Sequence, residues 1–475
     1  MMLIAQPLPF IVTFVTRLER ALRNVDPQAY LSTRQKGFIA FCIYATCLTN
    51  SICWAAFERA SLGTYTVRAL SWMLRQSKIP WEHLLTASIQ TICETYGLSE
   101  GIGVVDELDH QRSKRTKRLY KQHHIKDKKT GGYFMGQCVV FLIIVTPVVT
   151  IPVGFRFYEP DPAVTAWRRE DRRLKKAKVP ASERPPKPVR NPAYPSKHEV
   201  ALTLLEEFRA NFPNFTMTCV VADALYGPQT FLGRASAIFG GIQVISLAQG
   251  RQHIRHRNVM LPVSTFFTHY PGVAQDITVR GVTPITVTMS SARLYVKSHQ
   301  AKRFLIALQY PGQHTPRYLM ASDLSWRSCD IIQAYTSRWL VEVFFQDWTA
   351  REGWGRKSSQ FDEEGARRSV ILSLLLDHSL CFYPAQHARL EHKLPAYTVG
   401  SLCEKIQVEG LLHMVQELLE TDDPAAQLDH LTALIEEVYT LRVSTKHLSG
   451  RDMGSLESSP SLLLKYPHPV EEEAA

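Results

Sequence analysis

The stretch Tyr335–Trp348, YTSRWLVEVFFQDW, has an arginine and a glutamate among the apolar residues of a predicted helix. Because a helix turns by about 100° per residue, Tyr335, Arg338 and Glu342 fall close to one line along a single face. A helix that only packs against a core does not need such a polar line. The remaining faces carry aromatic residues for which core packing is expected, namely Trp339, Phe344, Phe345 and Trp348.

The bulk composition favours a globular protein with a polyanionic partner. The 475 residues are 45% hydrophobic and 21% charged, and 55 Lys plus Arg against 44 Asp plus Glu leave a formal charge of +11. Nucleic acid is the commonest partner for such a charge balance. The nine cysteines are scattered without a C-x-x-C pair, which argues against a zinc or redox motif and favours reduced thiols in the cytoplasm.

The pattern of apolar and polar residues predicts several structural segments. Residues 28–96 have helical character and fit a DNA-reading head or plain helical packing equally well. The predicted order is a helical N-terminal region over 1–98, an α/β part over 99–249 that includes a basic proline-rich loop at 159–199, a mainly β insertion over 250–325, a second α/β part over 326–385 and a helical C-terminal region over 386–475.

Two stretches of the first α/β part have unusual composition. Residues 139–153, VVFLIIVTPVVTIPV, are too few for a membrane-spanning helix and rich in β-branched residues, so a buried strand with a turn is expected and no membrane partner. Residues 167–199 are cationic and proline-rich, which excludes a continuous helix and joint burial of the charges. A solvated linker and a flexible arm along a phosphate backbone both explain this second stretch.

Three acidic residues interrupt apolar elements: Asp106 in GVVDELD, Asp223 in CVVADALYG and Glu342 in LVEVFF. An isolated ionised carboxylate in such a setting is costly unless it meets a cation or a metal ion. A fold that brought the three together would suit hard divalent cations with oxygen ligands. Two Mg²⁺ ions about 4 Å apart are the usual device for in-line attack on a phosphodiester.

Each carboxylate also has a purely structural explanation. Asp106 could cap a turn, with Glu107 or Asp109 as the better ligand. Asp223 could be a turn residue at the end of a strand, and Glu342 could pair with the arginine one helical turn earlier. If the three acids never meet, the chain is an unrelated basic enzyme.

The chain resembles the DDE transposases of bacterial insertion sequences that carry a Y-R-E-K signature. GIGVVDELD, followed by basic turns and YFMGQCVVFLIIV, matches the region of the first Asp, and CVVADALYG matches that of the second. YTSRWLVEVFFQDW matches the signature helix and is the specific part of the likeness. The resemblance covers roughly residues 101–377.

The resemblance implies an α/β fold in which a ribonuclease H-like catalytic core, over 99–249 and 326–385, is interrupted by the mainly β insertion and flanked by the helical N- and C-terminal regions. It implies double-stranded DNA as the partner, both as transposon ends and as target. A homodimer is expected in the DNA complex because two ends must be joined. The location implied is the bacterial cytoplasm, in association with the nucleoid.

The resemblance also implies roles for particular residues. Asp106, Asp223 and Glu342 are the expected catalytic metal ligands for two Mg²⁺ ions per site, with Mn²⁺ able to substitute. Tyr335 and Arg338 are expected to bind DNA phosphates near the cut, in agreement with the chemistry of a planar guanidinium.

The chain departs from the signature at one position. The lysine of the family, seven residues after the glutamate, falls on Thr349, which carries no charge. Three cations follow and are predicted to bind DNA in its place: Arg351, Arg356 and Lys357.

The function implied is that of a DNA transposase that binds the terminal inverted repeats of its insertion sequence, hydrolyses the phosphodiester at each end with Mg²⁺ and joins the freed 3'-hydroxyl to target DNA. One alternative, supported by Thr349, is a catalytically inactive DNA-binding protein derived from a transposase. Another is a ribonuclease H-like nuclease without strand transfer. Cleavage that depends on Glu342 excludes the first alternative, and a joining assay tests the second.

Overall fold

The computed structural model describes residues 7–112, 118–127, 129–277, 284–355 and 360–440. The chain forms two compact units, one ending at Glu420 and the other beginning at Thr421. The α-helices are α1 Pro9–Val25, α2 Thr33–Thr49, α3 Trp54–Ala60, α4 Val67–Arg75, α5 Trp81–Tyr96, α6 Pro162–Lys176, α7 Lys197–Asn211, α8 Gln229–Ile238, α9 Val263–His269, α10 Ser328–Thr336, α11 Trp339–Ala350, α12 Glu363–Leu380, α13 Pro384–Glu391, α14 Val399–Leu419 and α15 Pro424–Val438. The strands are β1 Glu100–Gln111, β2 His123–Lys126, β3 Tyr133–Val145, β4 Thr150–Tyr158, β5 Thr216–Ala222, β6 Gln243–Ala248, β7 His253–His256, β8 Val259–Pro262, β9 Val273–Ile277, β10 Ile285–Val296, β11 Ala301–Gln309 and β12 Arg317–Ala321.

The N-terminal helices pack around the apolar helix α2. A capping box in which Ser32 and Gln35 exchange hydrogen bonds starts α2, and most of its residues are buried against α1, α3, α12 and α14. Within the described ranges no single helix is long and apolar enough to cross a membrane, although α2 and α3, bent by 88°, meet that test of length and composition together.

One mixed sheet runs through the larger unit. Its strand order is β2-β3-β1-β5-β6-β12-β11-β10-β7-β8, with β4 paired to β3 and β9 paired to β10. Strand β1 is antiparallel to β3 and parallel to β5, and β5 is parallel to β6. The predicted buried strand with a turn over 139–153 is confirmed, since it spans most of β3 and the start of β4.

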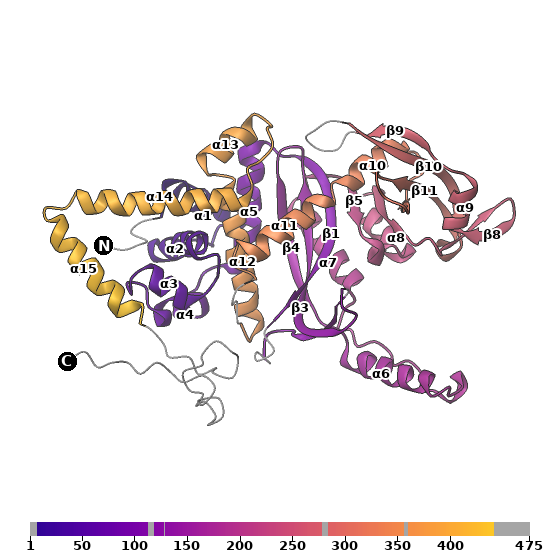
Figure 1. Ribbon diagram of the computed structural model, residues 1–475, viewed down its shortest axis with the longest axis horizontal. Helices are drawn as coiled ribbons and strands as arrows, with labels where there is room; N and C mark the ends of the chain where they lie inside the picture. The colour runs from indigo at the N-terminus through magenta and orange to yellow at the C-terminus, as the bar shows by residue number, and fades with distance from the viewer. Residues whose placement is uncertain (1–6, 113–117, 128, 278–283, 356–359, 441–475) are drawn as a thin grey trace, which may run out of the picture. The chain divides into compact units, whose positions relative to one another are not determined.

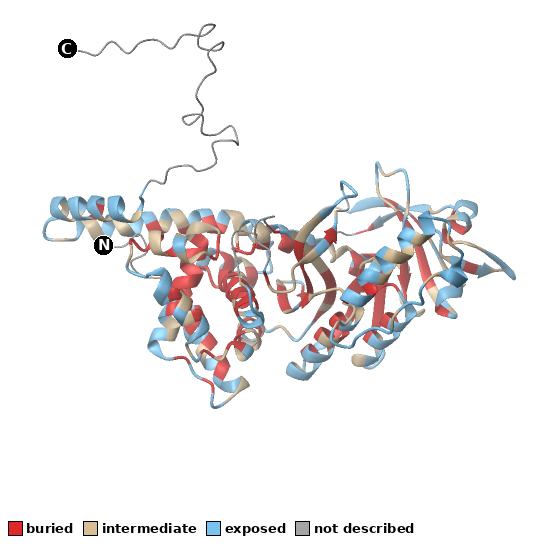
Figure 2. Cartoon of the chain, turned by 90° about the horizontal axis from the view of Figure 1, so that it is seen from below, coloured by how far each residue is buried: buried red, intermediate tan, exposed pale blue. Residues whose placement is uncertain are grey.

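The central strands are apolar on both faces because both faces are covered. Val104 and Val221 point into the core under α10 and α11, whereas Val105 and Val220 belong to the core shared with α5 and α7. Figure 2 shows the buried residues along these strands and on the inner sides of the N-terminal helices. The alternation fixes which face each following side chain occupies.

The expectation of a loop over 159–199 is wrong for its first half, which forms α6 and extends past the sheet (Figure 1). Pro162 occupies the first turn, where its missing N–H costs nothing, and the Asp161 side chain caps the helix by accepting from Ala163 N at 2.9 Å. The next proline is Pro180, so the cationic stretch between them is free to be helical and exposed. The helix ends at Lys176, before that proline.

The predicted β insertion continues the central sheet. Strands β7 to β12 lie within it, together with α9, and β12 pairs antiparallel with β6 from Tyr318–Ala248 to Ala321–Ile245. The end of β6 therefore lies where the core strands meet the insertion. Residues 278–283 of the insertion and 441–475 of the C-terminal region lie outside the described ranges, and the predicted segment boundaries stay predictions.

The smaller unit contains α15, which begins at Pro424. The Asp423 side chain caps this helix by accepting from Ala426 N at 3.0 Å. The predicted helical character after residue 386 is therefore present in α13, α14 and α15.

Candidate functional site

Asp106 and Asp223 occupy matching positions on neighbouring parallel strands. The last registered pair of β1 and β5 is Val105 with Ala222, and the two aspartates follow directly after it. Adjacent strands lie about 4.8 Å apart, so the two carboxylates share one edge and one face of the sheet. The alternation along β1 and β5 directs both to the face covered by α10 and α11.

The signature segment is two helices and not the single helix predicted. Helix α10 ends at Thr336, α11 begins at Trp339, and Ser337 and Arg338 join them. Short-range hydrogen bonds hold the junction, since Arg338 N donates to Tyr335 O at 3.1 Å and Val341 N donates to Arg338 O at 3.1 Å. This tight turn places the Arg338 side chain at the start of α11.

Arg338 bridges two of the three predicted metal ligands. Its Nη1 donates to Asp106 Oδ2 at 2.5 Å and its Nη2 donates to Glu342 Oε1 at 2.8 Å. The Glu342 side chain is 48% exposed, while that of Asp106 is only 11% exposed. The fold therefore brings Asp106, Arg338 and Glu342 together, with the guanidinium between the carboxylates.

The protonation of Asp106 is set by burial and by its charged neighbours. Burial raises the pKa of Asp106 to about 7, Arg338 opposes that shift, and the charges of Glu107 and Asp223 add to it. Opposing effects act on Arg338, because burial lowers the pKa of the guanidinium while Asp106, Tyr335 and Glu342 raise it, and the net direction is upward. A cation added beside Asp106 would favour its ionised form.

Tyr335 lies beside the same group. Burial raises the pKa of Tyr335 to about 12, Arg338 lowers it through charge and a hydrogen bond, and Asp223 raises it. The phenol is therefore a protonated donor at neutral pH. Arg317 of β12 also lowers the pKa of Tyr335, which makes Arg317 a further cation near the site that the sequence did not single out.

A second network, which sequence analysis missed, lies on the opposite face of β1. Lys197 Nζ donates to Glu107 Oε1 at 3.1 Å and lies 3.8 Å from Asp109 Oδ1. Tyr226 Oη donates to Glu107 Oε2 at 2.9 Å. Glu107 thus has protein partners and faces α7, away from Asp106. The capping box of Ser196 and Glu199 could have indicated the start of α7, though not which carboxylate Lys197 meets.

The other predicted DNA-binding residues have different outcomes. Arg351, at the end of α11, donates to Glu404 Oε1 of α14 at 3.2 Å. Arg356 and Lys357 lie outside the described residues. Thr349 donates to Phe345 O at 2.8 Å within its own helix. Core packing is confirmed for Phe344, Phe345 and Trp348 but is wrong for Trp339, which is 70% exposed because it opens α11 at the turn.

The oxygen donors at the site suit a divalent cation only in part. Asp106 and Asp223 supply carboxylate oxygens at matching strand positions, which fits a hard cation. Glu342 is held by Arg338, and among the described residues no group of three or more His, Cys, Asp or Glu side chains is arranged to hold a metal ion. The two aspartates therefore fit as ligands, and Glu342 would join them only on leaving Arg338.

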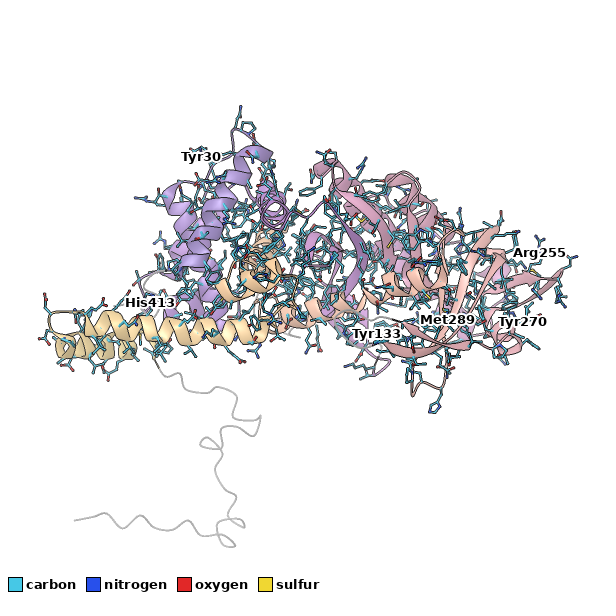
Figure 3. The ribbon with its side chains drawn as sticks, turned by 90° about the horizontal axis from the view of Figure 1, so that it is seen from above. Tyr30, Tyr133, Arg255, Tyr270, Met289 and His413 are labelled. Carbon is cyan, nitrogen blue, oxygen red and sulfur yellow. The ribbon has the colours of Figure 1, made fainter. Side chains whose placement is uncertain are left out.

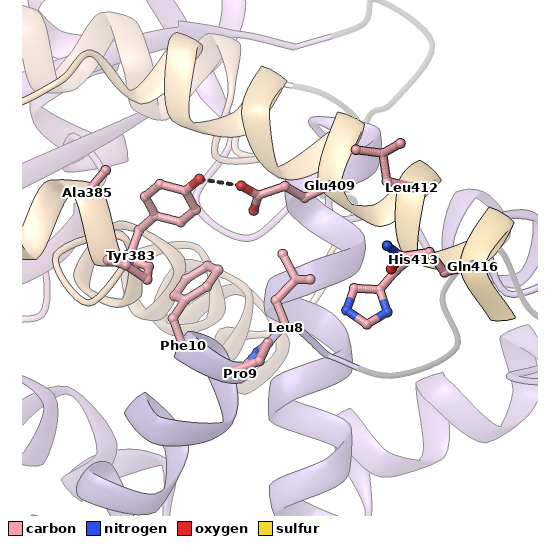
Figure 4. Close-up of a pocket in the computed structure, with 10 residues that line it drawn as sticks. Leu8, Pro9, Phe10, Tyr383, Ala385, Glu409, Leu412, His413 and Gln416 are labelled. Atoms are coloured by element: carbon pink, nitrogen blue, oxygen red, sulfur yellow. Dashed lines mark hydrogen bonds between the residues drawn. The ribbon is translucent and has the colours of Figure 1, made fainter.

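A separate cavity of about 460 Å³ lies between the start of α1, the start of α13 and α14 (Figure 4). Its lining is mainly apolar and includes Leu8 and Phe10. Tyr383 Oη donates to Glu409 Oε1 at 2.7 Å across it. None of the three predicted catalytic carboxylates lines this cavity.

Comparisons with known proteins give a similarity of fold. No protein-family model matches the sequence, and no curated protein matches it. The structure is similar to a piggyBac transposase, solved by cryo-EM as a synaptic complex with hairpin DNA, with a TM-score of 0.41 and 9% sequence identity over 97% of this chain and 88% of that chain.

Proposed function

We propose that the chain is a DNA transposase of the DDE type, which cleaves and joins DNA at the site formed by Asp106, Asp223, Arg338 and Glu342. The observation that carries the proposal is the contact of Arg338 with Asp106 and with Glu342 of the signature segment, beside a second strand-end aspartate, Asp223, in the matching position of the next strand. Segments more than 100 residues apart in the sequence converge there. An ion pair with a purely structural role would not require a second aspartate in the matching position of the next strand.

The strand arrangement supports a ribonuclease H-like core. The core strands lie in the order β4-β3-β1-β5-β6, with β3 antiparallel and β5 parallel to β1. Counted along the chain, β1 is the first of these five strands and carries Asp106, and β5 is the fourth and is followed by Asp223. This is the placement that the sequence resemblance implies for the two aspartates. The proposal includes double-stranded DNA as partner, a homodimer in the DNA complex and a cytoplasmic, nucleoid-associated location in a bacterium.

The charge of each residue decides its proposed role. Asp106 and Asp223, joined by Glu342, would hold the Mg²⁺ ions. When bound, Mg²⁺ activates the attacking oxygen and stabilises the leaving one. Arg338 is cationic at every accessible pH and offers donors in a planar fork, so it would exchange Glu342 for a phosphate of the DNA. Tyr335, protonated beside it, would donate to the same phosphate.

A second candidate function is DNA binding without catalysis. The specific observation in its favour is the Arg338 guanidinium between Asp106 and Glu342, which already neutralises both carboxylates. The uncharged Thr349 at the lysine position of the signature points in the same direction. In this alternative, Arg338 is a permanent structural bridge.

The deciding experiment is Mg²⁺-dependent cleavage of a labelled DNA that carries the sequences flanking the coding region. The proteins compared are the wild type, Glu342→Gln and the control Asp330→Asn. Asp330 is an acid of α10 that pairs with Arg327 at 2.8 Å, away from Asp106. The proposal expects cleavage by the wild type and the control, with a loss of about 100-fold or more in Glu342→Gln. DNA binding by all three without cleavage would establish the second candidate.

A further inference from the structure

A cavity of about 840 Å³ lies directly beyond Asp223, between the core strands and the β insertion. On the core side its wall includes Ala224 and Gly227, in the loop that follows Asp223, and the first residues of α8. On the insertion side its wall comes from the segment after β6, from β7 and from the turn after β10. The volume falls within the range of about 300–1,000 Å³ typical of ligand sites.

The polar part of the cavity lining consists of cations and neutral groups. Arg251 and Lys297 both line it, and no Asp or Glu is found among its described lining residues. Ile254 of β7 pairs with Val296 of β10, so Lys297 lies opposite His253 and brings two basic side chains to one wall. Gln252 Nε2 donates to Ser298 Oγ at 2.7 Å and so ties the two insertion segments together. A net positive, acid-free cavity suits an anionic ligand.

The cavity wall and the candidate catalytic site share one loop. Asp223 Oδ1 accepts from Leu225 N at 2.5 Å, and Ser246 Oγ donates to Asp223 O at 3.0 Å. His299, which is 4% exposed, lines the cavity and is hydrogen-bonded to the backbone of Gly227 at the other end of the same loop. Arg303 Nε donates to His299 Nδ1 at 3.2 Å and so fixes the orientation of the ring. An anion in the cavity would therefore lie next to the backbone that positions Asp223.

We infer that this cavity binds one nucleotide of a single DNA strand, with its phosphate against Arg251 and Lys297 and its sugar and base in the remaining space. The inference rests on the proposed function, because it assumes that a DNA strand passes Asp223. The cavity exceeds the needs of a lone phosphate, and a duplex is too wide to enter it. A free nucleotide presents the same chemistry, and the test below separates the two sources.

The test measures binding and not cleavage, so its failure is distinct from failure of the proposed reaction. The probe is a fluorescent oligothymidylate of about twelve nucleotides, titrated with full-length protein at several salt concentrations. The variant is Arg251→Ala/Lys297→Ala. The matched control, Arg257→Ala/Lys302→Ala, removes equal charge from the same insertion outside the cavity. Arg255, labelled in Figure 3, is unsuitable as a control because it stacks on Tyr295 at 4.4 Å.

We expect the cavity variant to lose about ten-fold in affinity and to lower the slope of log affinity against log salt by about 0.7, the contribution of one neutralised phosphate on a single strand. The control variant should lose no more than about two-fold. Arg251→Lys/Lys297→Arg should restore binding, which excludes misfolding as the cause of the loss. Asp330→Asn, which leaves both the cavity and the candidate catalytic site intact, should bind like the wild type whether or not the wild type cleaves DNA.

Three results would overturn the inference. The first is an equal loss of affinity in the cavity and control variants, and the second is absence of binding by the wild type. The third is displacement of the oligonucleotide by thymidine 5'-monophosphate with a dissociation constant far below that of the oligonucleotide. The third result would identify a site for free nucleotides.

Discussion

Two groups of carboxylic acids lie on or beside helices α11 and α12, and they differ in what neutralises them. Asp106 and Glu342 share the cation Arg338 at the edge of the sheet. Glu352, just after α11, is completely buried. Burial raises the pKa of Glu352 well above its ordinary value, and the charge of Asp377 on α12 adds to the shift.

The difference separates an acid whose counter-charge can exchange from an acid enclosed in a core. Burial also raises the pKa of Asp377 to about 7, and a hydrogen bond with Glu352 opposes the shift. This second pair is neutralised by protons and not by a cation. The first pair lies where a positive ligand or a phosphate can replace the arginine, because Glu342 is half-exposed. A buried carboxylate therefore marks a site only when a partner that can exchange lies beside it.

Removing the bridging cation is expected to have the largest effect. Arg338→Met should leave Asp106 without its counter-charge, raise the pKa of Asp106 further and reduce DNA cleavage by about 100-fold or more. The free energy of unfolding should fall by no more than about 3 kcal/mol, because Asp106 can take up a proton instead. Cleavage assays and urea denaturation measure the two effects. Cleavage that survives in Arg338→Met would show that the arginine is only structural.

Removing the central carboxylate should separate stability from metal binding. The pKa of Asp106 is raised from 3.8 to about 7, so the folded protein keeps a proton that the unfolded chain releases between these values. Stability from this group is complete below pH 3.8 and declines as the pH rises through about 7. Asp106→Asn should therefore be more stable than the wild type at pH 8, by roughly 1 to 3 kcal/mol, and nearly equal to it at pH 4.

The same variant tests the proposed Mg²⁺ ligands without an activity assay. Mg²⁺ at 100 times its dissociation constant should stabilise the wild type by about 2.7 kcal/mol at pH 8, measured as a rise in melting temperature. Asp106→Asn should lose most of that rise, whereas Asp330→Asn should keep it. An equal rise in all three proteins would place the bound Mg²⁺ elsewhere.

The buried pair should respond to pH without responding to Mg²⁺. In the folded protein the pKa of Glu352 lies above its ordinary value of 4.5, so the wild type loses stability as the pH rises above that value. Glu352→Gln has no proton to lose and should keep that stability. We expect a gain of roughly 1 to 2 kcal/mol at pH 8 and little change near pH 4, measured by thermal unfolding. Glu364→Gln, at a side chain 73% exposed on α12, is the control and should change stability little. A gain that is the same at both pH values would exclude protonation as the cause.

The sequence was sufficient where local periodicity decided the structure. The strands around Asp106 and Asp223 were predictable because β-branched runs fit a sheet covered on both faces. The helices α7 and α8 and the strand β6 lie in the part of the chain predicted as α/β over 99–249.

The sequence failed where contacts between distant segments decided the structure. No local pattern indicates that Lys197 pairs with Glu107, that the insertion adds its strands to the core sheet, or that Glu352 faces Asp377. The break between Thr336 and Trp339 was missed because both flanking segments are helical by composition. The register of β1 and β5, which puts Asp106 beside Asp223, is likewise set by packing across the whole sheet.

The smallest predicted effect concerns Thr349, which lies on α11, the helix that carries Glu342. Thr349 is partly exposed on α11, and its hydroxyl only returns to the backbone of its own helix, so replacing it with lysine removes no contact between elements. If DNA passes Arg338, Thr349→Lys should raise the affinity for duplex DNA by about two- to five-fold and steepen its salt dependence by about 0.9, the value of one added phosphate contact. Thr349→Gln adds length without charge and should leave both quantities unchanged. A lysine that changes neither would mean that the DNA path lies off this face of α11, and the role of Arg338 would then be confined to joining Asp106 and Glu342.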